Sequence, residues 1–134
     1  MSKIAIDTNV LLYFLDSSLD KRRTKAAELI LQNPIFNSQS LSELINVLNR
    51  RWKFPKASII EIIAKLMEEC KYVPITEETI ALSFDLVKKY DFQLFDAFIV
   101  ATALDSGCEF LYTEDLQHGL VIEKELVIFN PFKE

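Results

Sequence analysis

The sequence predicts an α/β protein in which a mostly parallel β-sheet carries helices on both faces. Short apolar runs of strand type alternate along the chain with longer segments of helical spacing. Parallel strands need crossover connections, so this alternation favours a parallel sheet covered by helices. The 134 residues contain no internal repeat, linker or break in composition, and we therefore expect one domain over 1–134.

The strand candidates are short apolar runs that end at polar or turn residues. The first, Ile4 to Ile6, stops abruptly at Asp7, and a later one is weakened by Pro74. In chain order they cover 4–6, 35–38, 71–75, 110–112, 120–122 and 126–129.

The helix candidates have apolar residues at helical spacing and recognisable end signals. They cover 10–15, 21–32, a segment from 40 to the break at Phe54-Pro55, 57–70, 76–90 and 95–105. Thr76 is the expected cap of its helix, and Gly107 follows the last helix as a C-terminal glycine does. Segment 95–105 is apolar nearly all round and should be buried.

The composition is that of a folded protein and argues against several functions. Half of the residues are hydrophobic and 26% are charged, which excludes a disordered chain. With only two glycines, a P-loop or a dinucleotide-binding loop is excluded. The net charge of −5 argues against a general polyanion binder, but it leaves room for an enzyme that contacts nucleic acid through a local basic rim and a bound metal.

The cysteines and the N-terminus indicate a cytoplasmic protein. Cys70 and Cys108 have no CxxC spacing and are expected to be reduced, buried thiols. The first apolar run is too short for a signal peptide or a membrane span, so no membrane association is expected.

Four acidic residues, far apart in sequence, lie where an open parallel sheet collects functional groups. Asp7 and Asp115 each follow a predicted strand, and Glu43 and Asp96 lie in the first turns of predicted helices. Sites in such sheets form at the carboxyl ends of the strands, where helices also begin. The four carboxylates can therefore converge on one edge.

Each acid also has a purely structural explanation. Ser40-x-x-Glu43 fits a capping box, Asp96 and Asp115 can be N-caps, and Asp7 can be a turn residue. The four together favour function, because Asp7 interrupts an apolar segment and Asp96 opens a helix with almost no polar face. A buried carboxylate needs a partner, and a divalent cation is a natural one for converging carboxylates.

Carboxylate ligands indicate Mg²⁺ or Mn²⁺ rather than zinc, since the chain has one histidine and two distant cysteines. Substrate phosphates often complete the coordination shell of such an ion. Two such ions can bind the attacking and the leaving oxygen of an in-line displacement at phosphorus. The single histidine, His118, disfavours a Ser–His–Asp hydrolase and is expected at the surface or in packing.

Two basic clusters, at 21–25 and 50–56, fit either phosphate contacts or solvated helix ends. Trp52 and Phe54 lie within the second cluster, where they can stack on bases, although packing is the favoured interpretation. The clusters alone therefore do not decide between nucleic-acid binding and a solvated surface.

Four segments present the acids in a recognisable order: Ile6-Asp7-Thr8-Asn9-Val10-Leu11, Ser42-Glu43-Leu44, Phe95-Asp96-Ala97-Phe98-Ile99-Val100-Ala101-Thr102-Ala103 and Tyr112-Thr113-Glu114-Asp115-Leu116-Gln117-His118-Gly119. Together they resemble the PIN-domain ribonucleases, and among these the VapC-type toxins of toxin–antitoxin pairs. The resemblance runs in order along nearly the whole chain.

The resemblance implies a three-layer α/β/α sandwich and Mg²⁺- or Mn²⁺-dependent endonucleolytic cleavage of RNA. It carries the catalytic site onto Asp7, Glu43, Asp96 and Asp115. Asp7, Asp96 and Asp115 would hold the metal directly or through water, and Glu43 would be a further ligand or orient a water. Thr8 and Thr113 would support the site. A homodimer and a small antitoxin bound over the site are also implied.

Three alternatives differ from this interpretation. A haloacid-dehalogenase-like phosphatase also has an Asp after its first strand, but its second acid is replaced here by Asn9. A receiver-like signalling domain needs paired early acids and a late lysine at a strand end, which the sequence lacks. A catalytically inert PIN-like interaction module, in which the acids only cap helices, is the third.

Overall fold

Six strands form one sheet within residues 2–18 and 20–133, the part of the chain that the computed structural model describes. They are β1 (Ile4–Ile6), β2 (Ile35–Asn37), β3 (Lys71–Val73), β4 (Phe110–Tyr112), β5 (Val121–Ile122) and β6 (Leu126–Phe129). The order across the sheet is β3-β2-β1-β4-β6-β5, and only β5 runs antiparallel to its neighbour among these strands. The predicted, mostly parallel sheet is confirmed.

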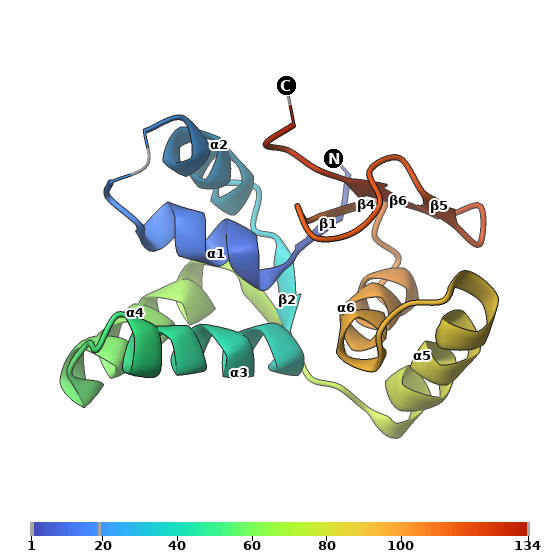
Figure 1. Ribbon diagram of the computed structural model, residues 1–134, viewed down its shortest axis with the longest axis horizontal. Helices are drawn as coiled ribbons and strands as arrows, with labels where there is room; N and C mark the ends of the chain where they lie inside the picture. The colour runs from blue at the N-terminus through green and yellow to red at the C-terminus, as the bar shows by residue number, and fades with distance from the viewer. Residues whose placement is uncertain (1, 19, 134) are drawn as a thin grey trace.

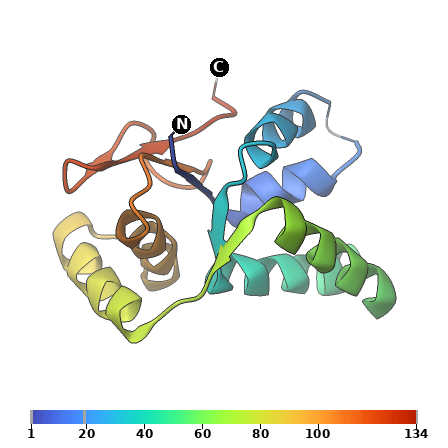
Figure 2. The ribbon, with the colours of Figure 1, turned by 180° about the vertical axis from the view of Figure 1, so that it is seen from behind.

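Helices cover both faces of this sheet, which confirms the three-layer α/β/α sandwich (Figures 1 and 2). Helices α1 to α4 gather on one side, and α5 and α6 on the other. The helices are α1 (Thr8–Leu15), α2 (Asp20–Ile30), α3 (Ser38–Asn46), α4 (Lys56–Glu69), α5 (Glu77–Tyr90) and α6 (Leu94–Asp105), with a π-helical segment η1 (Val47–Arg51) between α3 and α4.

The central strands are buried on both faces because successive side chains of a strand point to opposite sides. Ile4 and Ile6 of β1 belong to the core that α1 and α2 cover, whereas Ala5 between them belongs to the core under α6. Phe36 and Ile35 of β2 divide between the two cores in the same way. This double burial holds the strand ends, and the residues that follow them, in fixed positions.

Strands β1, β2 and β4 end at one edge of the sheet. Ile6 pairs with Tyr112 in parallel register, so the next residues, Asp7 and Thr113, leave the sheet side by side. The Asp7 N–H donates to the Tyr112 carbonyl oxygen at 3.1 Å. Strand β2 ends at Asn37, which is the N-cap of α3. Functional sites of open parallel sheets form at this edge.

Helix α6 is buried along its middle, as its apolar sequence predicts, but its first turn is not. Ala97 and Val100 are fully buried, whereas Leu94 is 57% and Phe95 64% exposed. The expected burial from Phe95 onward is therefore wrong for this turn. The Phe95 ring packs on Phe98, with 6.2 Å between ring centroids, rather than in either core.

Two features of the backbone have no counterpart in the sequence-based expectations. At η1, the Trp52 N–H donates to the Val47 carbonyl five residues earlier, at 3.0 Å, and Lys53 then turns the chain with a φ of 55°. At the β5–β6 hairpin, Glu123 and Lys124 both have positive φ, which reverses the chain tightly and makes β5 antiparallel.

The two cysteines, Cys70 and Cys108, are buried and free, as predicted. Burial raises the pKa of the Cys70 thiol to about 12 and that of Cys108 to about 11, so both are unreactive thiols at neutral pH. Within the described ranges, no helix has the length and apolarity to cross a membrane.

Candidate active site

Asp7 lies at the centre of the carboxyl edge and is held by hydrogen bonds to both of its carboxylate oxygens. It caps α1: the Thr8 N–H donates to Oδ1 at 2.6 Å. The Thr113 hydroxyl donates to Oδ2 at 2.9 Å. Asp7 is 3% exposed, and it is the N-cap of α1 rather than the turn residue of the structural alternative. Its deep burial goes beyond what a helix cap requires.

Glu43 reaches from α3 to the start of α1. The Thr8 hydroxyl donates to Glu43 Oε2 at 2.7 Å, and Gln39 Nε2 donates to Oε1 at 3.0 Å. The capping-box alternative is wrong for Glu43, because α3 begins earlier than predicted. Its N-cap is Asn37, whose side chain accepts from the Ser40 N–H at 3.0 Å.

Asp115 is connected to the site through Asn9 and Thr113. Asn9 Nδ2 donates to Asp115 Oδ2 at 3.1 Å and to the Thr113 hydroxyl oxygen at 3.3 Å. The Asp115 N–H donates to the same hydroxyl oxygen at 3.2 Å. Thr113 is fully buried, and the hydrogen bonds of its hydroxyl connect Asp7 to Asp115. Asp115 caps no helix, in contrast to the structural alternative.

Asp96 enters from the opposite layer, in the first turn of α6, whose N-cap is Gln93. The charges of Asp115 and Glu43 both contribute to the raised pKa of Asp96. Asn37 ties the two layers together, since its Nδ2 donates to the Phe98 carbonyl oxygen at 3.2 Å and to Thr102 Oγ1 at 3.0 Å. Hydrogen bonds through Thr8, Thr113 and Asn9 thus connect Asp7, Glu43 and Asp115 at one edge, and the charges of Glu43 and Asp115 act on Asp96.

Burial and the charges of neighbouring carboxylates raise the pKa of two of these acids, Asp7 and Asp96. Burial, partly offset by the Thr8 and Thr113 hydrogen bonds and assisted by the Glu43 and Asp115 charges, raises the pKa of Asp7 to about 6. Burial and then the charges of Asp115 and Glu43 raise the pKa of Asp96. The ion pairs found in the described part of the chain are Lys25–Glu28 and Lys89–Glu123, and neither includes one of the four acids.

The donor set fits a hard divalent cation. Asp7, Glu43 and Asp115 share the edge, and Asn9, whose Nδ2 donates to Asp115, has a buried Oδ1 without a hydrogen-bond partner among residues 2–18 and 20–133. Oxygen donors of this kind suit Mg²⁺ or Mn²⁺. Among the described residues, no three Asp, Glu, His or Cys side chains are grouped closely enough to hold a metal ion. The fit to Mg²⁺ or Mn²⁺ therefore rests on the type of oxygen ligand, and not on a complete set of metal ligands.

Sequence reasoning did not identify three polar residues that position these acids: Asn9, Asn37 and Gln39. Gln39 is four positions before Glu43 in α3, a spacing at which helical side chains meet. Asn37 directly precedes the helix, where asparagine is a preferred N-cap. The sequence identifies Asn9 only as the residue that replaces the second acid of a haloacid-dehalogenase-like phosphatase. His118 is exposed, accepts from the Asn130 N–H and packs on Phe129, as predicted.

A protein-family model matches most of this sequence. The PIN domain model matches residues 4–121, and the chain belongs to the PIN domain family. The resemblance of the four acid-bearing segments is confirmed. A comparison with curated protein sequences finds no match.

Solved structures of toxin–antitoxin proteins have the same fold. A toxin–antitoxin complex from Klebsiella pneumoniae has a TM-score of 0.72 at 19% identity, covering 99% of this chain and 100% of that one. VapC20 of Mycobacterium tuberculosis, a sarcin–ricin loop cleaving toxin, has a TM-score of 0.67 at 18% identity, covering 84% and 92%. DNA-bound VapBC from Salmonella typhimurium has a TM-score of 0.71 at 16% identity, covering 98% and 99%.

Proposed function

We propose that the chain is one nuclease domain, a Mg²⁺- or Mn²⁺-dependent endoribonuclease and the toxin of a type II toxin–antitoxin pair. One observation carries the proposal. Acids from four distant segments share the carboxyl edge of the sheet, and none of them forms an ion pair with a described cationic side chain. Membership of the PIN domain family, which contains ribonucleases, supports the same activity.

Asp7, Asp96 and Asp115 are the proposed metal ligands, directly or through water. A divalent ion held by these residues would lower the pKa of a bound water molecule and stabilise negative charge on a phosphodiester. Thr113 orients Asp7, and Asn9 orients Asp115. An ion bound to the carboxylates also makes a locally anionic edge able to accept a phosphate.

Glu43 is the proposed group that orients the attacking water and takes up its proton. Thr8 and Gln39 each donate to a different oxygen of this carboxylate, which fixes the plane of the group. A general base needs this kind of fixed geometry relative to the proton that it accepts. Thr8 and Thr113 are accordingly positioning residues.

The proposed substrate is RNA with unpaired nucleotides, since sequence-selective recognition of RNA uses single strands and loops. One of the similar structures is a toxin that cleaves the sarcin–ricin loop, which supports an RNA substrate. Two buried free cysteines support a cytoplasmic location.

The proposed protein partners are a small antitoxin and a second copy of the chain. Similar structures include toxin–antitoxin complexes, which supports the antitoxin. An apolar groove between α3 and α4 supports a protein partner on that face: Ile45, Ile60 and Ile63 line it, and Ile60 is 69% exposed. Apolar surface of this kind is typical of interfaces.

Cleavage of total bacterial RNA by the purified chain tests the function. We expect cleavage with Mn²⁺ or Mg²⁺ and none with excess EDTA. Asp96→Asn should abolish cleavage while the melting temperature is kept. Asp105→Asn, the same substitution at an exposed position of the same helix, is the matched control and should cleave normally. If the unmodified chain neither cleaves RNA nor binds Mn²⁺, the inert interaction module is correct instead.

A further inference from the structure

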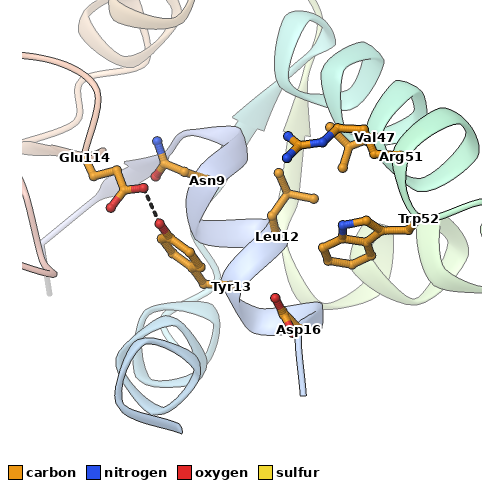
Figure 3. Close-up of a pocket in the computed structure, with 8 residues that line it drawn as sticks. All are labelled: Asn9, Leu12, Tyr13, Asp16, Val47, Arg51, Trp52 and Glu114. Atoms are coloured by element: carbon orange, nitrogen blue, oxygen red, sulfur yellow. Dashed lines mark hydrogen bonds between the residues drawn. The ribbon is translucent and has the colours of Figure 1, made fainter. Parts of the chain in front are cut away.

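A cavity of about 330 Å³ lies directly beside the acidic edge (Figure 3). Its size is within the range of small-molecule sites, roughly 300–1,000 Å³. Asn9 belongs to both places: it lines the cavity, and its Nδ2 donates to Asp115 Oδ2 at 3.1 Å. A group bound in the cavity is therefore adjacent to a group bound at the acids.

Two aromatic side chains form walls of the cavity. Tyr13 is fixed, because its hydroxyl donates to Glu114 and accepts from Arg22 Nη1 at 3.0 Å, and the Arg22 guanidinium lies 5.0 Å from the ring centroid. Trp52 and Leu12 both line the cavity (Figure 3), and the indole N–H of Trp52 has no hydrogen-bond partner among the described residues. Because the Arg22 guanidinium and the Phe132 ring, 4.7 Å between centroids, already pack on Tyr13, Trp52 is the wall that can accept a flat ring by stacking.

The π-helical segment η1 brings a free cation to the same cavity. Val47 and Arg51, at its two ends, both line the cavity, and the Arg51 guanidinium points inward (Figure 3). Arg51 makes no hydrogen bond or ion pair within the described residues. A planar guanidinium suits the oxygens of a phosphate. The neighbouring Arg50 does not line the cavity.

Two carboxylates complete the lining and supply acceptors. Glu114 uses Oε1 to accept from Tyr13, and Asp16 uses Oδ1 to accept from Ser18. The second oxygen of each makes no hydrogen bond with the described residues. Carboxylates accept hydrogen bonds from exocyclic amino groups of bases, such as N4 of cytosine. Uracil carries an oxygen at that position and would be disfavoured.

We propose that this cavity binds one unpaired nucleobase that carries an exocyclic amino group, with the adjoining backbone phosphate on Arg51. The inference rests on the proposed ribonuclease function and deepens it, since the cavity would select the nucleotide next to the bond that is cut. Trp52 stacks on the base, and Tyr13, held by Arg22 and Phe132, borders it. Glu114 and Asp16 select the amino group of the base, and Asn9 connects the selected nucleotide to the acids. Trp52 would then pack against the protein core and also stack on the bound base.

Fluorescence of Trp52 tests the proposal directly, because it is the single tryptophan of the chain. The Asp96→Asn protein is titrated with hexacytidylate and with hexauridylate, which differ at the exocyclic group of the base. We expect quenching by both, with binding of hexacytidylate about fivefold tighter. Arg51→Ala should weaken hexacytidylate binding about 5- to 10-fold and lower the salt dependence by about one phosphate contact. Arg50→Ala, the matched control, should change affinity by less than about twofold.

A labelled hexamer followed by anisotropy extends the test to Trp52 itself. Trp52→Leu should weaken binding about tenfold, and Trp52→Phe should retain most of the affinity because it keeps a stacking ring. If Trp52→Leu does not fold, Trp52→Phe and the two arginine variants still decide the matter.

Equal affinities for the two hexamers, or equal effects of Arg51→Ala and Arg50→Ala, would overturn the proposal. So would an Arg51→Ala protein that binds RNA normally but no longer captures its co-expressed antitoxin, because the cavity would then be a protein-binding site. These titrations need no cleavage. They therefore give the same answer whether or not the unmodified chain cuts RNA, and failure of the two proposals can be told apart.

Discussion

The Thr8 hydroxyl donates to Glu43 Oε2 at 2.7 Å across 35 positions of sequence. Thr8 is the first residue of α1, and its own backbone N–H donates to Asp7. One residue therefore positions two of the four acids, through its main chain and its side chain. Glu43 therefore bonds to the start of α1 instead of capping α3, which the proposed role of Glu43 requires.

Thr8→Val tests this relationship, because valine has nearly the same shape but cannot donate. We expect a fall in kcat of about 10- to 100-fold, with a small change in KM, since loss of a hydrogen bond to a charged group costs roughly 1.5–3 kcal/mol. Thr8→Ser keeps the hydroxyl and should restore most of the rate. Steady-state cleavage of a fluorescent RNA gives both constants. A valine variant as fast as the unmodified chain would remove Thr8 from the site.

Asp7→Asn should abolish cleavage and also stabilise the fold at neutral pH. The pKa of Asp7 is about 6 in the folded chain and 3.8 for the ordinary group, so the folded state binds the proton more tightly. Stability is therefore lost as pH rises from about 4 to about 6, and above that the cost is about 3 kcal/mol. The amide removes the charge but leaves the Thr113 hydroxyl without its acceptor, so a gain of roughly 1–2 kcal/mol is expected.

Urea unfolding at a series of pH values measures this effect. The difference in unfolding free energy between Asp7→Asn and the unmodified chain should grow from pH 4 to pH 6 and then stay constant. Asp85→Asn, at an exposed position of α5, should show no such growth. A difference that does not depend on pH would contradict the raised pKa.

Mn²⁺ should raise the melting temperature, because an ion that binds only the folded state stabilises it. At ten times the dissociation constant the gain is about 1.4 kcal/mol, which corresponds to about 5 °C for a chain of this size. Excess EDTA should reverse the shift, and Asp96→Asn should remove most of it. Differential scanning calorimetry makes the measurement. An equal shift in Asp96→Asn and Asp105→Asn would place the ion elsewhere.

The sequence predicts this fold because its signals are local. Ile4 to Ile6 is an apolar run cut off by Asp7, and the Thr76 cap starts α5 where expected. The general rule that parallel strands end at a common edge was then enough to bring the four acids together. Family-like segments around Asp7 and Asp96 led to the PIN domain family, which the family model confirms.

What the sequence did not predict depends on contacts between distant segments. The widening of α3 into η1 has no local signal, yet it places Arg51 and Trp52 at the cavity. The hydrogen bond from Asn9 to Asp115 spans 106 positions and depends on the register of β1 and β4. Exposure of Phe95 likewise follows from where α6 meets its neighbours rather than from its hydrophobicity.

Asn37→Ala tests how strongly the site depends on the joint between the two helical layers. Asn37 is buried, caps α3 through the Ser40 N–H, and donates to Phe98 and Thr102 of α6. Loss of a cap costs about 1 kcal/mol, and the two acceptors left in α6 add roughly 1–2 kcal/mol. We therefore expect a loss of about 2–3 kcal/mol in the free energy of unfolding.

The matched control for Asn37 is Thr76→Ala, which removes the cap of α5 and its bonds to Thr79 without touching a second layer. It should cost about 1 kcal/mol. Activity is a second difference between the two variants. Asn37 joins α3, which carries Glu43, to α6, which carries Asp96, so its loss should lower kcat in the protein that remains folded, whereas Thr76→Ala should not. Equal stability losses, or an unchanged kcat in Asn37→Ala, would show that the two layers hold the acids in place without this joint.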